Sequence, residues 1–354
     1  MGGPESPGSW QAPGHKYLCG SLLEGCDFMG DSARLVLVLR EALEKGSLPV
    51  SAMVGVSGGI DSCTLVHALV AAGSRPVVTH YDHGWGPAAA EDPAFVGELA
   101  ARLGLQFRSG AAHPAPARQR EDEARRQRYA FFAQQAVELG CEDLVLAHHA
   151  DDQVETLLLQ MLRGGGSGAV GMRETSTMRV TTDGREVVLR VHRPWLGVWR
   201  REIEAYAQLQ RIDWKEDATN LDGAHLRNRL RHDLVPLLEA IGGPHVRGKL
   251  LDFAATRRDE QEWLDAICKP WAMCEKLSVK DLRAQPEFAL RRIIWAWLLA
   301  RGVAGLRRRH VEEVAAMVAV GGPAKVNLPG DKHVRRRMRE LFVENGPEKA
   351  ASDK

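Results

Sequence analysis

The segment 57–62, with the sequence SGGIDS, carries the strongest chemical signal in this chain of 354 residues. It follows an apolar run at 50–56 and precedes an apolar-periodic stretch at 63–72, which indicates a strand, a tight turn and a helix. Backbone N–H groups at such a helix start favour anions, and glycine lets the backbone approach a phosphate closely. We therefore predict a phosphate site whose residues are Ser57, Gly58, Gly59, Ile60, Asp61 and Ser62. Asp61 repels phosphate, so we expect it to hold Mg²⁺ beside one; an ordinary turn is the simpler alternative.

Other nucleotide-binding motifs do not fit. The string G-x-x-x-x-G-K-[ST] does not occur in the chain. A G-x-G-x-x-G string occurs at 166–171, but it follows a helical pattern rather than a strand, so a dinucleotide-binding turn is disfavoured. We interpret it as a flexible glycine loop near the site.

Composition narrows the class of protein. The length of 354 residues is enough for two or three domains, and a hydrophobic content of 44% supports packed cores. The net charge of +1 argues against a strongly basic surface overall. The stretch 301–345 is an exception, with ten Lys/Arg against five Asp/Glu. Six cysteines form no C-x-x-C pair, which disfavours a zinc ribbon or a cluster site and fits a reducing, cytoplasmic setting. No membrane span or signal peptide is predicted.

Strand and helix patterns alternate between residues 50 and 196, which predicts a doubly wound, mostly parallel α/β sheet. The predicted strands are 50–56, 76–81, 105–108, 143–147 and 187–191. The predicted helices are 32–45, 62–72, 89–103, 118–139 and 150–162. In such a sheet the loops at 57–62, 80–84 and 148–152 meet on one rim, where ligands bind.

We divide the chain into five parts. A disordered leader (1–30) precedes the α/β domain (31–200) and a helical region that completes it and serves as a linker (201–270). A small, basic α+β domain (271–346) and a disordered tail (347–354) follow. Within the small domain we predict helices at 286–301 and 309–320, then a β tail at 324–328 and 333–343.

A second loop, HHADDQVET at 148–156, ends a strand and opens a helix. Asp152 and Glu155 are three residues apart and share a helix face. Two carboxylates beside a phosphate site can bind a metal ion or hold an amine nucleophile. Helix capping by Asp151 or Asp152 and a solvated face are the alternative. A zinc site is disfavoured because adjacent histidines point apart.

Cationic side chains occur in two further segments. Arg125 and Arg128 share one face of a helix and could meet a phosphate, although a salt-bridged surface helix is the common alternative. The run 227–231 places Arg227 and Arg231 near a helix start, where the helix dipole disfavours cations. Either a polyanionic partner or a neighbouring acidic helix would explain that placement.

Taken together, these segments resemble the tRNA(Ile)-lysidine synthase family of the N-type ATP pyrophosphatase (PP-loop) superfamily. The resemblance runs in family order over 50–238 and includes the tail around Leu328-Pro329-Gly330. The matching segments are 57–62, 80–84, 121–129, 148–156, 163–172, 193–196, 217–220 and 227–231. Trp85-Gly86 stand where the family has Leu-Arg, so a role for an arginine there is not expected. A further C-terminal β domain of the longer family form is not expected in this chain.

The resemblance implies an ATP- and Mg²⁺-dependent ligase that joins free L-lysine to C2 of the wobble cytidine in isoleucine tRNA with a CAU anticodon. Adenylation of the base, with release of pyrophosphate, would precede displacement of AMP by the amine. By this resemblance the catalytic residues would be Asp61, Asp152, Glu155 and Arg125. The loop 57–62, His80 and Asp82 would contact the nucleotide. Asp152 and Glu155 would bind lysine, and Asp61 and Asp152 would bind Mg²⁺. The expected tRNA contacts are Arg128, Arg227, Arg231, Arg307, Arg308, Arg335 and Arg336. For the arginine runs a solvated surface is the alternative, and a homodimer is left open.

Three rival functions remain. A tRNA thiolase would commonly use paired cysteines, which this chain lacks as C-x-x-C. An amidating ligase such as an NAD or GMP synthetase needs an ammonia source, and no glutaminase pattern is visible. A non-catalytic RNA-binding relative would not be expected to keep the loop 57–62 together with Asp152 and Glu155.

Overall fold

A computed structural model describes residues 28–84, 92–112, 121–164, 169–182, 184–215 and 226–345. The chain forms two compact units. The first unit is Met1–Asp152 with Arg173–Leu221, and the second unit is Gln153–Met172 with Asp222–Lys354. The predicted tail, the leader up to residue 27, Trp85-Gly86 and the segment 217–220 lie outside the described residues.

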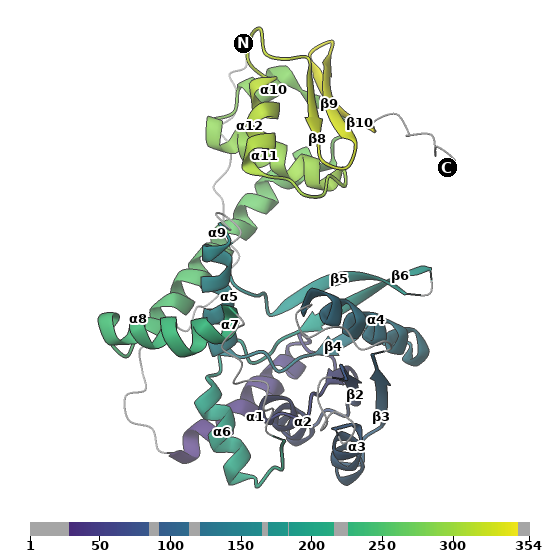
Figure 1. The fold of residues 1–354 in the computed structure, drawn as a ribbon, viewed down its shortest axis with the longest axis vertical. Coiled ribbons are helices and arrows are strands. Elements are labelled where there is room, and N and C mark those ends of the chain that lie inside the picture. The colour runs from purple at the N-terminus through teal and green to yellow at the C-terminus, as the bar shows by residue number, and fades with distance from the viewer. Residues whose placement is uncertain are drawn as a thin grey trace, which may run out of the picture. The chain divides into compact units, whose positions relative to one another are not determined.

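The first unit is built on a six-stranded sheet with the order β3-β2-β1-β4-β6-β5 (Figure 1). Five strands are parallel, and β5 joins the edge antiparallel to β6. The strands are β1 (Met53–Gly55), β2 (Val77–Asp82), β3 (Phe107–Ala111), β4 (Asp143–Val145), β5 (Thr175–Thr182) and β6 (Arg185–His192). The predicted doubly wound, mostly parallel fold is confirmed, and β5 is a strand that the sequence patterns did not predict.

Helices cover both faces of this sheet. They are α1 (Phe28–Glu44), α2 (Ile60–Ala71), α3 (Asp92–Arg102), α4 (Glu121–Leu139) and α6 (Arg200–Leu209). One apolar cluster joins α1, α2, α3 and α6, with Leu39, Leu65 and Leu99 fully buried. A second cluster packs α4 against the opposite face, where Phe132 meets Leu144. The two apolar layers keep the sheet between helices, so ligands can approach only its rims.

The second unit begins within a helix. The helix α5 (Ala150–Leu162) has the predicted bounds, and it starts in the first unit. The other helices of this part are α7 (Leu226–Arg229), the π-helical turn η4 (Leu230–Leu234), α8 (Val235–Gly242) and the long α9 (Val246–Met273). The predicted boundary at residue 270 falls within α9, which continues through Pro270 and packs Cys268 and Trp271 into the next core.

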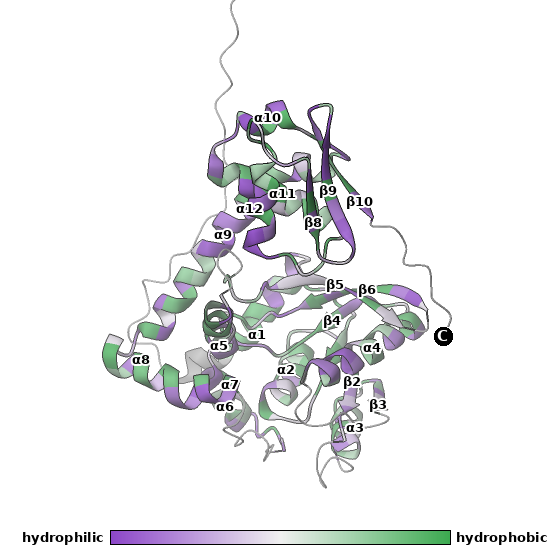
Figure 2. Ribbon diagram, turned by 45° about the horizontal axis from the view of Figure 1, so that its top comes forward, coloured by the Kyte–Doolittle hydropathy of each residue, from purple (hydrophilic) through white to green (hydrophobic). Residues whose placement is uncertain are grey.

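The last part of the second unit is a small α+β fold with a four-stranded antiparallel sheet, ordered β7-β10-β9-β8. Its elements are β7 (Leu277–Ser278), α10 (Val279–Arg283), α11 (Glu287–Ala300), α12 (Arg308–Ala316), β8 (Lys325–Leu328), β9 (Lys332–Arg337) and β10 (Glu340–Asn345). The predicted strand 333–343 is in fact a hairpin, which turns at Met338 and Arg339 with positive φ. Figure 2 shows β9 as mostly hydrophilic and α8 as mostly hydrophobic, in keeping with their sequences KHVRRR and VPLLEAIG.

Trp297 is the largest fully buried side chain of the small fold, and its indole Nε1 donates to the Cys274 carbonyl at 2.9 Å. We expect Trp297→Ala to lower the free energy of unfolding by about 3–5 kcal/mol, because it leaves a large cavity. The exposed Trp263→Ala, at a side chain that is 66% exposed, is the matched control and should change stability by less than about 0.5 kcal/mol. Urea denaturation followed by circular dichroism measures both, and equal losses would contradict this account of the core.

Candidate nucleotide-binding site

The strands β1 and β4 are neighbours in the sheet and run parallel, with Met53 paired to Leu144 and Val54 to Val145. The chain leaves β1 toward α2 and leaves β4 toward α5, and the strand order reverses between them. Ligands of open α/β sheets bind outside the carboxyl ends of the strands at such a switch point. The two loops that carry the strongest chemical signals in the sequence therefore start side by side.

The turn after β1 needs a glycine and is internally braced. Gly58 has φ +96°, a conformation that L side chains rarely adopt. The Ser57 N–H donates to the Ser62 hydroxyl at 3.1 Å, and that hydroxyl donates to the Gly59 carbonyl at 3.0 Å. The Gly58 carbonyl accepts from the Lys215 N–H at 2.9 Å. The turn is thus held in one shape, which leaves the start of α2 available for an anion.

His149 brings the acidic residues together. Its side chain is 2% exposed, and its Nε2 lies 3.8 Å from an Asp61 oxygen and 3.6 Å from an Asp152 oxygen. Its Nδ1 lies 3.7 Å from Asp151. The structure therefore brings Asp61 and Asp152 to one imidazole. Sequence reasoning considered His149 only as a zinc ligand and missed this contact.

Asp152 also serves the helix, as the capping alternative predicted. Its carboxylate accepts the His149 N–H at 3.1 Å, which satisfies a donor at the start of α5. Asp151 accepts the Arg200 N–H at 3.0 Å and so ties this loop to α6. Among the described residues no group of three or more His, Cys, Asp or Glu forms a ready metal site. Two carboxylates beside a phosphate-binding turn nevertheless suit Mg²⁺, which takes one or two protein carboxylates together with substrate phosphates.

His80 and Asp82 lie at the carboxyl end of β2. His80 is 3% exposed, and its Nδ1 lies 2.8 Å from the Val56 carbonyl, so Nδ1 carries the proton that is donated. Asp82 accepts the Gly84 N–H at 2.7 Å. These contacts support the exit of β1 and the turn after β2. Both residues therefore have structural roles, which were not part of their predicted role as nucleotide contacts.

Arg125 and Arg128 lie in the first turns of α4, and both guanidinium groups stack on the ring of Tyr129. The guanidinium carbons are 4.7 Å and 5.9 Å from the ring centroid. The predicted shared face of the two arginines is therefore present, and it is formed around an aromatic side chain.

In the second unit, Glu155 is 2% exposed and holds two cations. Its oxygens lie 2.6 Å from Nε of Arg231 and 3.2 Å from Nε of Arg227. Arg227 also donates to the Thr156 hydroxyl at 3.1 Å. The acidic neighbour that sequence reasoning left open thus explains the arginines at this helix start. This pairing argues against Arg227 and Arg231 as tRNA contacts, and it makes Glu155 less available to a lysine amine.

The C-terminal arginines divide by their surroundings. Arg336 donates to the carbonyls of Met317, Ala319 and Gly322, at 3.0 Å and 2.9 Å for the latter two, so it holds the end of α12 rather than a ligand. Arg335 pairs with Glu344 at 2.9 Å, and Arg308 pairs with Glu312 at 2.7 Å. The side chain of Arg307 is exposed. The predicted tRNA contact therefore suits Arg307 and does not suit Arg336.

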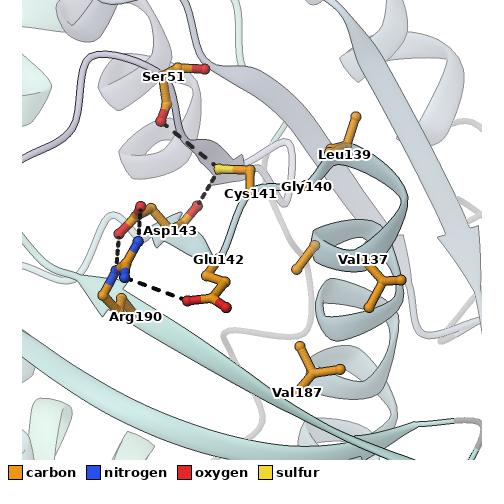
Figure 3. Close-up of a pocket in the computed structure, with 10 residues that line it drawn as sticks. Ser51, Val137, Leu139, Gly140, Cys141, Glu142, Asp143, Val187 and Arg190 are labelled. Atoms are coloured by element: carbon orange, nitrogen blue, oxygen red, sulfur yellow. Dashed lines mark hydrogen bonds and ion pairs between the residues drawn. The ribbon is translucent and has the colours of Figure 1, made fainter.

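A cavity of about 560 Å³ lies elsewhere in the first unit (Figure 3). It is lined by residues at the amino ends of the strands, including Ser51, Cys141 and Asp143. Arg190 donates two hydrogen bonds to Asp143, at 2.8 Å and 2.7 Å, and holds the pKa of that carboxyl below its usual value. Since β4 begins at Asp143, this cavity is on the rim opposite the glycine turn.

Cys63 lies directly behind the glycine turn, and burial raises the pKa of its thiol to about 12. Because the thiolate is the reactive form and a raised pKa depletes it, about one thiol in 10⁴ is ionised at pH 8. We expect Cys63 to resist a maleimide reagent in the native protein while the exposed Cys274 reacts. Mass spectrometry of peptides labelled before and after unfolding checks this. Labelling of Cys63 in the native protein would show that its thiol is not buried behind the turn.

Two family descriptions match the chain. Residues 37–238 match the "PP-loop domain", and residues 277–342 match the "TilS substrate binding domain". A tRNA(Ile)-lysidine synthase of Solibacter usitatus is 37% identical, over 78% of this chain and 63% of that relative. The one of Geobacter sulfurreducens is 35% identical over 82% and 64%. The one of Ralstonia nicotianae is 34% identical over 88% and 68%. The chain thus spans about two thirds of the length of these relatives.

Among solved structures, the U34-tRNA thiolase NcsA of Methanococcus maripaludis resembles this chain with a TM-score of 0.51. The match covers 64% of this chain and 80% of the thiolase at 12% sequence identity. That likeness shows a common fold. No helix in the described ranges is long and apolar enough to cross a membrane. The motif order, the site at the switch point and the extended similarity agree, and the chain belongs to the tRNA(Ile)-lysidine synthase family of PP-loop ATP-binding proteins.

Proposed function

We propose that the protein uses ATP to join free lysine to C2 of the wobble cytidine in isoleucine tRNA with a CAU anticodon. One observation carries the proposal: Asp61 and Asp152 approach a single nitrogen of His149, beside a glycine turn with positive φ, at the switch point of a PP-loop fold. Family membership supports lysine and tRNA as the substrates. Since both are cytoplasmic, we place the protein there. A homodimer stays a prediction.

In the first step, O2 of the cytidine attacks the α-phosphorus of ATP and pyrophosphate leaves. The backbone N–H groups at the start of α2 bind the pyrophosphate, and the positive φ of Gly58 keeps that backbone open to it. Asp61 and Asp152 would hold Mg²⁺, which neutralises charge on the phosphates. Arg125 contacts a phosphate, either that of the adenylate or one of the RNA backbone. The wobble base must leave its stack to reach the site.

In the second step, the ε-amine of lysine attacks C2 and AMP leaves. A lysine ammonium, with an ordinary pKa of about 10.4, must first lose a proton. Asp152 and Glu155 lie on one face of α5 and are the carboxylates for this amine. Asp152 is the more available of the two to the amine, because Arg227 and Arg231 already pair with Glu155.

Incorporation of labelled lysine into unmodified isoleucine tRNA tests the proposal. We expect label that requires ATP and falls by about a hundredfold or more in Asp61→Ala, because the site loses a carboxylate that would hold Mg²⁺ beside the reacting phosphates. Asp213→Ala is the matched control, since this carboxylate is 66% exposed and pairs with Arg102 on the surface. Its activity should equal that of the unchanged protein.

The alternative is another tRNA-modifying enzyme of the PP-loop group, such as a thiolase, or a relative that only binds RNA. Absence of lysine label while ATP is still cleaved to AMP and pyrophosphate would overturn the lysine assignment and direct the search to a sulfur or ammonia donor. Absence of both label and ATP cleavage would leave an RNA-binding protein.

The two kinds of C-terminal arginine predict different outcomes. We expect Arg307→Ala to weaken tRNA binding without changing Tm. The slope of log Kd against the logarithm of the salt concentration should fall by about one. Arg336→Ala should instead lower Tm, because it leaves carbonyls at the end of α12 without their donor. Filter binding over a range of salt concentrations and thermal denaturation measure both variants. A lower Tm for Arg307→Ala, or an unchanged Tm for Arg336→Ala, would reverse the assignment.

A further inference from the structure

Arg193 is a buried cation at the carboxyl end of the sheet. It follows β6 directly, and only 6% of it is exposed. Its Nη1 donates to the Arg173 carbonyl at 3.0 Å and to the Ser176 hydroxyl at 2.9 Å. Its Nε is buried with no hydrogen-bond partner, and no carboxylate pairs with it in the part of the chain that the structure describes. A buried charge without a counter-ion is unfavourable, and a bound anion would offset that cost.

Tyr129 connects this buried cation to the surface. Burial lowers the pKa of Arg193, and the Tyr129 hydroxyl that lies against it opposes that effect. The same hydroxyl accepts a hydrogen bond from Nη2 of Arg125 at 3.2 Å. Tyr129 itself is 3% exposed and is fixed edge-to-face against Phe132, with ring centroids 6.0 Å apart. The ring therefore gives Arg125 a rigid platform as well as a hydrogen-bond acceptor.

The proton of that hydroxyl has no acceptor among the described residues. A phenol oxygen can accept two hydrogen bonds and donate one. Because Arg125 donates to it and Arg193 presents a second positive group to it, neither guanidinium group can accept the O–H proton. An anion placed against Arg125 would accept it. The arrangement thus suits a phosphate oxygen, which takes charge-assisted hydrogen bonds from both groups.

The location agrees with this chemistry. α4 follows β3 and crosses back toward the start of β4, so its first turns, which carry Arg125 and Tyr129, lie at the carboxyl rim of the sheet. The loop after β4 is tied to the same rim, since the Leu146 N–H donates to the His192 carbonyl at 2.9 Å. Arg193, next in the chain, is therefore adjacent to the loop that carries His149.

We propose that Tyr129 is a positioning residue, held by the buried Arg193, that presets Arg125 and helps it to bind a phosphate oxyanion of the substrates. The inference rests on the proposed function, because it names the support of that site. An arginine side chain loses much rotational freedom on binding, and prior orientation removes part of that loss. The phosphate belongs either to ATP or to the RNA backbone.

Tyr129→Phe tests the proposal, because it removes the oxygen and keeps the ring against Phe132 and Arg125. We expect kcat/KM in the lysine-incorporation assay to fall about tenfold for one substrate, since one charge-assisted hydrogen bond is lost. Varying ATP at saturating tRNA, and then tRNA at saturating ATP, tells which phosphate Arg125 binds. Tyr206→Phe is the matched control, a 5% exposed tyrosine in α6, and should keep the unchanged kinetics and Tm.

A double variant distinguishes positioning from a general structural effect. If Tyr129 acts through Arg125, then Tyr129→Phe in an Arg125→Ala background should cost no further activity. The proposal would be overturned if the activity losses of the two single variants multiply in the double variant. It would also be overturned if Tyr129→Phe leaves kcat/KM unchanged for both ATP and tRNA. If the unchanged protein makes no lysidine, the proposed function fails separately. ATP and tRNA affinities of Tyr129→Phe, measured by calorimetry and filter binding, then decide this inference, and two unchanged affinities would refute it.

Discussion

The parallel pairing of β1 with β4 is the constraint on which the rest of the first unit depends. Because these two strands adjoin, the glycine turn and the acidic loop leave the sheet at the same rim. His149 can then lie within reach of both Asp61 and Asp152. The apolar layers on both faces fix the pairing, since a strand moved out of register would carry Met53 or Val54 away from its own core. The arrangement of Asp61, Asp152 and His149 thus depends on the apolar packing on both faces of the sheet.

Local patterns were enough to predict the parts of the site that lie close together in sequence. The SGGIDS turn and the bounds of α5 follow from apolar periodicity and helix-start residues, which act over a few positions. Alternation of such elements also predicted the parallel sheet. The edge strand β5 was not predicted because its sequence TSTMRVTT is polar and contains no apolar run. Its side chains alternate between half-buried and exposed, as on a sheet edge with one covered face.

Partners that are distant in sequence could not be predicted. Nothing near Glu155 in the chain indicates that Arg227 and Arg231 will neutralise it. The same holds for Arg336, whose guanidinium holds the end of α12, although its neighbours in sequence suggest a basic patch. Charged residues have weak local preferences, and their partners follow from the fold. Sequence therefore indicates which cations exist, and tertiary structure decides which of them are left for a ligand.

The hydrogen bond from the Lys215 N–H to the Gly58 carbonyl joins the glycine turn to a much later part of the chain. During synthesis the segment 57–62 leaves the ribosome long before residue 215 does. Until then the turn lacks one of the backbone contacts that hold its shape. Contacts of such high sequence separation form late in folding, because a long loop must close first. A nascent chain therefore completes the contacts of its glycine turn only when almost all of the first unit has been made.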